Sequence, residues 1–404
     1  MKINTHNTIK HERIIYILST IILFIGMLEN YQKLRYLIIL PCLILIWIFI
    51  FIKEKFILNK KYIKKTTSIL IILISLALPS YFNISPHTNN LGYSFSQYSL
   101  GFIFKVLSAI TIIYACRNDT KALTLIIRYC LIINLSIFFI QFIVVYSTSY
   151  YIDPLAIITG EHQRYGSRFL IPLIGNIYRP TGFFEEPSTY AAFITCLLAC
   201  NFLINERIDT VIVLSILSII LSLSVAALIY GTFLLLFILY KKNNNFLKII
   251  ISLIFPLFLM LITYFALLRL NSLNGIATEI RFNLMNLVFS QDSSSLIFGN
   301  GMLGMINDIT FYLKNNMLWK IDIASLNDNG LWLFIIIKMG LIGLLLFITY
   351  VCKKLKTRTD ILFFFILLTT KINLFSFMLI FYFLIIYFCN SDSPKKEHNY
   401  EKIQ

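Results

Sequence analysis

Charged side chains are scarce in this sequence. They make up 13% of the 404 residues, whereas hydrophobic residues make up 58%. A soluble domain usually carries about twice this share of charge, so the composition excludes an ordinary water-soluble fold. The apolar residues also fall in long blocks separated by short polar stretches, which is typical of membrane spans. The sequence therefore predicts that a lipid bilayer is its solvent.

Acidic residues are scarcer than basic ones, with 19 Asp and Glu against 35 Lys and Arg and a formal net charge of +16. Such a surplus raises the question of nucleic-acid binding. Most of the basic residues, however, lie in loops on one side of the predicted spans, including Lys53 to Lys65 and Lys353 to Arg358. This is the positive-inside pattern, which explains the charge without a nucleic-acid partner and predicts that both termini are cytoplasmic.

Two further absences narrow the possibilities. All 7 cysteines lie inside apolar runs or at their cytoplasmic ends, so none is placed for an exported disulfide. Cys196 and Cys200 share a helix face without a neighbouring His or carboxylate, which favours packing residues over a metal site. A signal-peptide cleavage site is also missing, because Glu29-Asn30-Tyr31 stands where small residues are needed. The first apolar run is therefore interpreted as an uncleaved span.

A series of long apolar runs marks the predicted membrane helices. They are Ile14 to Leu28, Tyr36 to Ile52, Thr66 to Phe82, Ser99 to Cys116, Ala122 to Tyr146, Ser188 to Ile204, Ile208 to Tyr240, Phe246 to Leu268, Leu331 to Cys352 and Ile361 to Cys389.

Two of these runs are too long for a single span. The run from Ile208 would form about 50 Å of helix, against a hydrocarbon core of roughly 30 Å, and is predicted to turn near Ser222. The run from Ile361 carries Lys371 and Asn373 near its middle, where a charge at bilayer depth is costly, so it should turn there. With both turns, we expect an all-α integral membrane protein, a single polytopic domain over residues 1–404 with about twelve transmembrane helices.

Two long loops lie on the predicted non-cytoplasmic face, at residues 147–186 and 266–330. Long loops in compact proteins are usually functional or disordered. These two keep aromatic and aliphatic residues throughout and lack low-complexity runs, which favours ordered, functional loops.

The first loop ends in an Arg, a Pro-Thr-Gly turn and two carboxylates, from Arg179 to Pro187, and leads directly into the next apolar run. Pro187 suits the first turn of a helix. A helix start offers unpaired N–H groups and the positive end of the helix dipole to an anionic ligand. This segment is the strongest site candidate in the chain.

The stretch RPTGFFEEPSTYAAF, from Arg179 to Phe193, resembles the motif at the corresponding span of bacterial O-antigen polymerases of the Wzy type, which share a superfamily with the O-antigen ligases. LIFGNGMLG, from Leu296 to Gly304, and NDNGLWLFIIIKMGLIGLLLF, from Asn327 to Phe347, resemble stretches that close the second periplasmic loop of that superfamily and open its next span. The expected spans, two large periplasmic loops and cytoplasmic termini also match its plan.

The resemblance implies a C-type glycosyltransferase-like enzyme of the bacterial inner membrane. Such an enzyme joins undecaprenyl pyrophosphate-linked oligosaccharide repeat units into O-polysaccharide at the periplasmic face, with a chain-length regulator as a candidate partner and no cofactor.

A pyrophosphate leaving group needs cationic clamps, and the planar guanidinium fork of Arg binds phosphate in a bidentate manner. These arginines could also have roles that do not involve a substrate. Arg179 and the neighbouring glutamates could anchor the loop at the lipid headgroups, and Arg164 and Arg168 could be ordinary loop charges. The predicted substrate-binding residues are Arg179, Arg164, Arg168, Arg269 and Arg281.

A sugar hydroxyl that acts as nucleophile needs a carboxylate or histidine base. The predicted catalytic residues are Glu186, Glu185 and Asp328. Glu186 is preferred because it shares its segment with Arg179, which would hold the donor close to the base. Glu161, His162 and Asp308 are also available in the outer loops, and no metal ligands are expected.

Two alternative functions can be weighed from the sequence. O-antigen ligases resemble this chain but carry a functional His beside Asn just before the span that begins here at Leu331. This chain has Asp328-Asn329 at that place, and residues 266–330 contain no His, which favours a polymerase. A flippase or other transporter commonly shows internal repeats, and none is found.

The topology predicts where reporter domains will lie. Fusions after Lys65, Gln163, Lys242 and Asn316 should report cytoplasm, periplasm, cytoplasm and periplasm, because the basic loops stay inside. A paired phosphatase and fluorescent reporter measures each side. A periplasmic signal at Lys242 would contradict the turn near Ser222.

Overall fold

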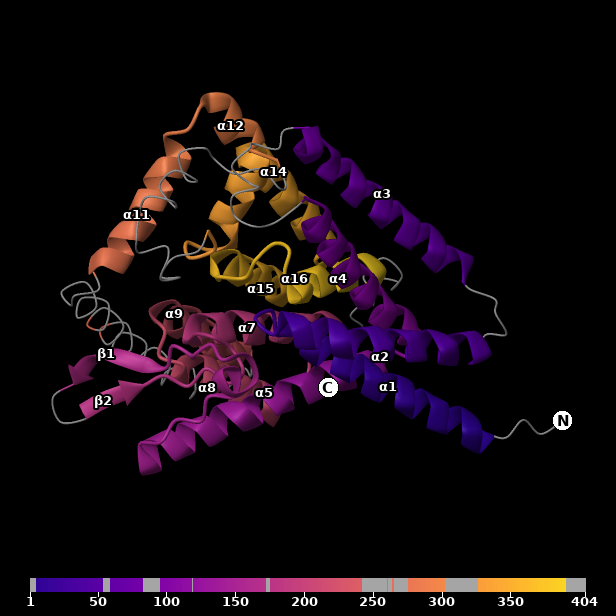
Figure 1. Cartoon of the computed structure of the whole chain (residues 1–404), viewed down its shortest axis with the longest axis horizontal. Coiled ribbons are helices and arrows are strands. Elements are labelled where there is room, and N and C mark those ends of the chain that lie inside the picture. Colours follow the sequence, from indigo (N-terminus) through magenta and orange to yellow (C-terminus); the bar gives the residue numbers. More distant parts are fainter. Residues whose placement is uncertain are drawn as a thin grey trace, which may run out of the picture.

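The computed structural model describes residues 5–53, 59–82, 95–117, 119–171, 175–241, 260, 264, 275–301 and 326–389 (Figure 1). The elements are α1 (Thr5–Met27), α2 (Gln32–Lys53), α3 (Lys60–Phe82), α4 (Phe95–Ala115), α5 (Thr120–Thr148), α6 (Pro154–Thr159), β1 (Gly166–Ile171), β2 (Gly175–Tyr178), α7 (Pro187–Ile204), α8 (Thr210–Leu221), α9 (Val225–Lys241), α11 (Gly275–Phe289), α12 (Ser293–Phe298), α14 (Leu331–Lys354), α15 (Arg358–Thr369) and α16 (Phe377–Cys389).

The helices follow the predicted apolar runs. Among the described residues, four helices are long and apolar enough to cross a membrane: α5, α7, α14 and the part of α2 from Leu34 to Lys53. Shorter apolar helices lie in α4, α8, α9 and α16. This helical content is consistent with a multi-pass membrane protein. The predicted run from Phe246 to Leu268 lies outside the described residues except for Met260 and Tyr264, so twelve spans stay a prediction.

Both predicted turns inside the long runs are confirmed. The chain reverses between α8 and α9, where Leu223 has a positive φ of 52°. It reverses again between α15 and α16, where the Asn373 carbonyl accepts the backbone N–H of Ser376 at 2.9 Å. α8 and α15 each have 12 residues. Each is therefore only about 18 Å long, which is shorter than the roughly 30 Å hydrocarbon core.

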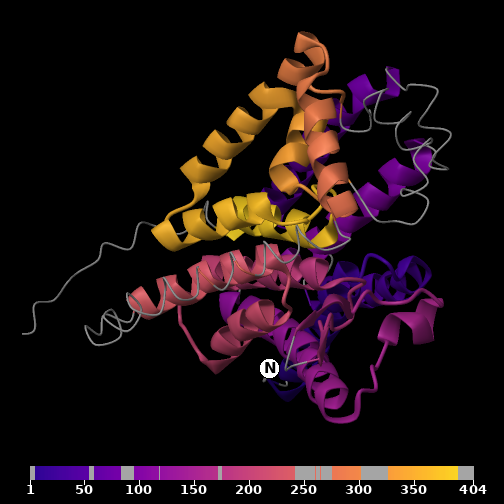
Figure 2. The ribbon, with the colours of Figure 1, turned by 90° about the vertical axis from the view of Figure 1, so that its left-hand side faces the viewer.

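The centre of the molecule is α7. Nearly all of its side chains are buried, and it contacts α5, α8, α9, α15 and α16. Figure 2 shows α15 and α16 lying over α7. Because α7 begins directly after Glu186, the segment with the strongest sequence signal is anchored to the most buried helix.

The described residues are mostly helical, which agrees with the predicted all-α class, and the first long loop adds a small antiparallel hairpin of β1 and β2. Gly166 pairs with Tyr178, and Ile171 pairs with Gly175 (Figure 1). The sequence here contains Ile, Phe and Tyr, which favour strands. The backbone N–H of Arg179 donates to the Tyr165 carbonyl at 2.8 Å, so the hairpin fixes the start of the Arg179 segment.

A sharp break divides α14 at Gly340, which has a φ of 70° and a ψ of −177°. α12 packs against this break. Asn300, which follows α12, donates its backbone N–H and its side-chain Nδ2 to the Ile337 carbonyl at 3.1 and 2.9 Å. Gly299 makes this approach possible, because an added Cβ would lie 2.5 Å from the Gly340 nitrogen and 2.6 Å from the Lys338 carbonyl oxygen.

We expect Gly299→Ala to lower the free energy of unfolding by about 3 kcal/mol or more, through backbone overlap and strain at a φ of 81°. Gly160→Ala is the matched control. Gly160 has a φ of 80° but no atom within 4 Å of the added Cβ, so the loss should be about 1 to 2 kcal/mol. Denaturant unfolding in detergent micelles measures both. Equal losses would show that the contact between α12 and α14 is loose.

Candidate functional site

Glu186 occupies the N-cap position of α7, and Pro187 is the first helical residue, as predicted. The Glu186 side chain makes no capping hydrogen bond. Its carboxylate instead contacts Lys371, with 3.3 and 3.4 Å between Nζ and the two carboxylate oxygens. The acidic group is therefore held by a partner outside its own helix.

Lys371 also binds the second predicted carboxylate. Its Nζ lies 2.8 Å from Oδ1 of Asp328, which precedes α14. Asp328 is only 4% exposed, whereas Lys371 and Glu186 are 14% and 25% exposed. Ion pairs become stronger when they are shielded from water. One lysine in the turn between α15 and α16 thus joins the ends of the two long loops.

The backbone around α14 sets this geometry. The N–H of Leu331 donates to the Thr370 carbonyl at 3.0 Å, which joins the start of α14 to the end of α15. Gly330 allows this contact, because a Cβ there would lie 3.0 Å from the Leu368 carbonyl oxygen. The Asn329 side chain donates to the Arg281 carbonyl at 2.9 Å and so ties α11 to the same point.

Two cavities meet at this charged group. The smaller one, of about 360 Å³, is lined by Arg179, Arg281, Glu186, Asp328 and Lys371. Its remaining polar groups include the hydroxyls of Ser188, Ser224, Thr369 and Thr370, so the turns that end α8 and α15 both reach it. Within the described part of the chain, Nε of Arg281 is buried and has no hydrogen-bond partner. Three cations beside hydroxyl donors form a suitable environment for a phosphate group.

A larger cavity of about 790 Å³ adjoins the same charged group, since Glu186, Asp328 and Lys371 line both cavities. Glu185 is part of its wall and is held by two partners: Nη2 of Arg164 at 2.9 Å and Nδ2 of Asn30 at 2.9 Å. The Arg164–Glu185 pair thus closes the first loop on itself, and the Asn30–Glu185 bond links that loop to the α1–α2 connection. This pairing suits a structural role better than a catalytic one.

A second partly buried lysine supports the turn that carries Lys371. Nζ of Lys105 lies 3.1 Å from Oε1 of Glu29 and donates to the Phe375 carbonyl at 2.9 Å. The same Glu29 oxygen accepts the backbone N–H of Phe377 at 3.1 Å, at the start of α16. Glu29 lines the larger cavity, so Lys105 reaches its edge.

Two buried glutamines fix the turn between Arg179 and Glu186. Oε1 of Gln141, from α5, accepts the N–H of Gly182 at 2.7 Å. Nε2 of Gln163 donates to the carbonyls of Gly182 and Phe184 at 2.9 and 2.8 Å. Every such bond satisfies a backbone group that burial would otherwise leave unpaired.

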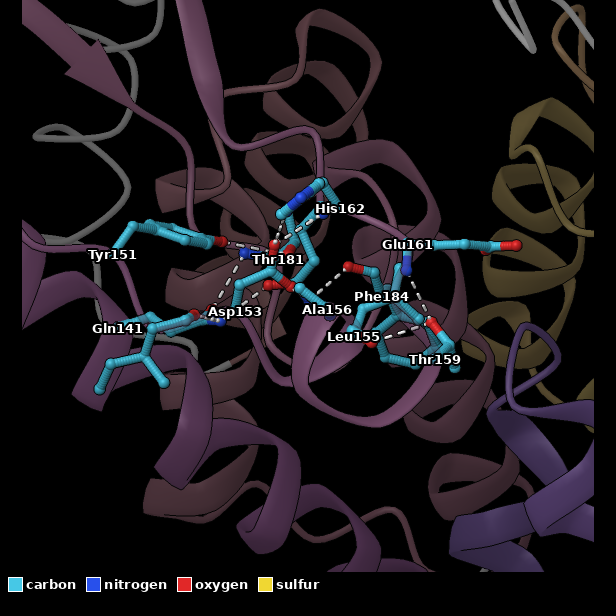
Figure 3. Close-up of polar contacts among 12 residues, drawn as sticks. Gln141, Tyr151, Asp153, Leu155, Ala156, Thr159, Glu161, His162, Thr181 and Phe184 are labelled. Atoms are coloured by element: carbon cyan, nitrogen blue, oxygen red, sulfur yellow. Dashed lines mark hydrogen bonds and ion pairs between the residues drawn. The ribbon is translucent and has the colours of Figure 1, made fainter.

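Two tyrosines complete this support. Figure 3 shows Tyr151 and Gln141 converging on Thr181, and the Tyr151 and Thr181 hydroxyls lie 3.2 Å apart. Burial raises the pKa of Tyr151, although its bond with Thr181 acts in the opposite direction. The Tyr31 hydroxyl donates to the Phe183 carbonyl at 3.0 Å, and burial raises the pKa of Tyr31 too. Both phenols therefore remain neutral over the ordinary pH range.

The structure brings together Arg179, Arg281, Glu186 and Asp328 from the predicted set. It places Arg164 and Glu185 in the wall of the larger cavity. Arg168 lies in β1, whereas Arg269 and Asp308 lie outside the described residues. Glu161 lines the larger cavity, and His162 is exposed beside Asp153. Among the residues that the structure describes, no cluster of His, Cys, Asp and Glu could hold a metal ion.

The contact of Lys371 with both carboxylates was not predicted from the sequence, where this residue only indicated a turn. A usable signal was nevertheless present, because an ionisable residue within an apolar run is a site candidate by itself. Gln141 gave a weaker signal of the same kind, as an amide near the end of a predicted span.

No family model, curated protein or solved structure matches this chain. A function must therefore be argued from the chemistry of the site.

We expect Lys371→Met to lower the free energy of unfolding by about 3 kcal/mol, because it leaves two partly buried carboxylates facing each other. Adding Asp328→Asn to Lys371→Met should recover more than half of this loss. Thermal and denaturant unfolding of the purified protein provide the measurement.

The control is Lys53→Met. Lys53 pairs with Glu12 at 2.7 Å, but both side chains are exposed, so the loss should stay below about 1 kcal/mol. Equal losses for the two lysine variants, or no recovery in the double variant, would contradict a central role for Lys371.

Proposed function

We propose that this chain is an O-antigen polymerase of the Wzy type, which joins undecaprenyl pyrophosphate-linked repeat units into O-polysaccharide. The observation that carries this proposal is the group of three cations and two carboxylates where two cavities share a wall. Transfer of a sugar from a pyrophosphate carrier needs both kinds of group in one place. The motifs that resemble the polymerase superfamily contribute Arg179, Glu186 and Asp328 to this group.

In this proposal the smaller cavity receives the pyrophosphate of the donor. Arg179 and Arg281 bind its oxygens in a bidentate manner, and Lys371 adds a point charge. These cations stabilise the negative charge that grows as the bond between the sugar C1 and the phosphate oxygen breaks. The hydroxyls of Ser188 and Thr370 are available to the remaining oxygens.

The larger cavity receives the acceptor repeat unit, which is also lipid-linked. The acceptor hydroxyl attacks C1 of the donor sugar and gives its proton to Glu186. The new glycosidic bond forms as undecaprenyl pyrophosphate leaves with the electron pair of the broken C–O bond. Asn30, Thr159 and Asn327 line this cavity and suit hydrogen bonding to sugar hydroxyls.

Glu186 is a better candidate base than Asp328 for two reasons. It is 25% exposed where Asp328 is 4% exposed, so an acceptor can reach it. Its contacts with Lys371 are also longer, at 3.3 and 3.4 Å against 2.8 Å. Asp328 then acts as a positioning residue that holds Lys371.

The enzyme would work at the periplasmic face of the bacterial inner membrane, with both termini in the cytoplasm and a chain-length regulator as partner. A ligase that transfers polysaccharide to lipid A-core is the alternative of the same class. It is disfavoured because residues 266–330 contain no His. A flippase is a further alternative. The charged groups shared by the two cavities favour an enzyme over a flippase.

The test is in vitro polymerisation with purified protein and lipid-linked repeat units. Glu186→Gln should lower turnover by roughly a hundredfold or more, because it removes the basic oxygen but keeps size and polarity. Arg179→Lys should lose most activity, because a point charge does not replace a bidentate fork. Asp328→Asn should lower turnover less than Glu186→Gln does, because it weakens the hold on Lys371 but leaves the base in place.

Glu185→Gln is the matched control, because its carboxylate is adjacent in sequence but bound to Arg164 and Asn30. It should retain turnover within a few fold. If Asp328→Asn alone abolishes turnover, the base belongs to the second loop. Normal polymer from Arg179→Lys at normal protein level would remove Arg179 from the donor site.

A further inference from the structure

A third cavity lies away from the charged group, between α2, α3 and α4. It measures about 560 Å³ and is lined almost wholly by apolar and aromatic side chains. Its few polar groups are hydroxyls and the indole Nε1 of Trp47, which donates to Oγ1 of Thr111 at 3.2 Å. Leu40, Ile44 and Ile48 on its α2 side are 53%, 53% and 47% exposed. The cavity is therefore a groove that opens outward from α2.

Basic side chains stand at one end of this groove. Ile63 and Thr67 of α3 line it. Lys60 and Lys64 lie on the same face of α3 as these two residues, because residues three or four positions apart are neighbours on a helix surface. Both lysines are exposed. Long lysine side chains commonly extend from an apolar surface to the headgroup region.

A third cation strengthens the same end. The Arg117 guanidinium stacks on the ring of Tyr114, 4.1 Å from its centre, and Tyr114 lines the groove. The acidic Glu12, which reaches the nearby end of α2, is paired with Lys53. The mouth of the groove thus presents positive charge to a ligand.

The dimensions of the groove fit one leaflet of a bilayer. Its α2 wall runs from Leu40 to Phe51, which corresponds to about 17 Å of helix. This is roughly half of a 30 Å hydrocarbon core. A lipid chain can therefore lie along the groove while its headgroup stays beside the lysines.

The groove and the candidate site lie at opposite ends of α2. Tyr31, just before α2, lines the larger cavity of the site, whereas the cationic mouth lies near Lys53, where α2 ends. A lipid whose headgroup rests on Lys60 and Lys64 therefore cannot present a pyrophosphate to Arg179 and Arg281. Its occupant belongs to the leaflet opposite the site.

We propose that α2, α3 and α4 bind one anionic phospholipid, with its headgroup on Lys60, Lys64 and Arg117 and an acyl chain in the groove. Lysines near a lipid surface attract anionic headgroups, and the apolar groove supplies the second contact. This site is independent of the proposed polymerase activity, because it shares no residue with either cavity of the charged group.

The first test uses native mass spectrometry of the full chain in detergent with phosphatidylglycerol and with phosphatidylcholine of the same acyl chains. We expect phosphatidylglycerol to bind more tightly. The double variant Lys60→Gln and Lys64→Gln should weaken its binding by roughly thirtyfold, since each lysine contributes about a fivefold gain. The control, Lys353→Gln with Lys354→Gln at the end of α14, should change it little. Equal binding of the two lipids, or equal losses in the two double variants, would overturn the proposal.

The second test needs no lysine variant. Phosphatidylglycerol with a photoreactive group in its acyl chain is irradiated with the wild-type protein, and the labelled peptides are mapped. Labels should fall within residues 40–51, 62–67 and 104–114, and Ile44→Trp, which fills the groove, should suppress them. Labels confined to other helices, or unchanged labelling of Ile44→Trp, would show that the groove holds no such lipid.

Discussion

The contact of Lys371 with Glu186 and Asp328 is the constraint on which the candidate site depends. These three residues come from the start of α7, the segment before α14 and the turn between α15 and α16. In surroundings that exclude most water, opposite charges attract strongly and any unpaired charge is costly. The lysine therefore fixes the mutual position of three chain segments. It also leaves more negative than positive charge among the three groups, which the nearby arginines Arg179 and Arg281 offset.

The polar groups around this centre form successive supports. Gln141 and Gln163 hold the turn before Glu186, and Glu29 with Lys105 holds the turn that carries Lys371. Each support satisfies backbone groups that have no water partner in the interior. A site built in this way is preorganised: its charged groups keep their positions before a ligand arrives. Such rigidity suits an enzyme whose reaction develops charge at a fixed point.

The two ends of the bundle differ in chemistry. One end holds the charged cavities, whereas the other holds an apolar groove with a basic mouth. α2 connects them, because it begins beside Tyr31 and ends at Lys53. A lipid bound in the groove would contact α2 along its outer face and so stabilise the helix whose start borders the larger cavity.

The apolar runs and Pro187 predicted the order of the described helices, both internal turns and the start of α7, because hydrophobic length and proline chemistry are local properties. The starts of α1 and α3 were not predicted, because both helices extend into polar sequence before their apolar runs. Local pattern also selected Arg179, Glu186 and Asp328 as candidates. It could not show that Glu186 and Asp328 share one lysine, because that contact joins residues 185 and 43 positions from Lys371 in sequence. Local pattern also could not show the break at Gly340, which depends on α12 packing against it. Nor could it separate Glu185 from Glu186, because the two differ only through their partners, which are Arg164 and Asn30 for Glu185. The local sequence thus determines which side chains are present at the site. Contacts between distant segments decide which of them pair, and so which role each can have.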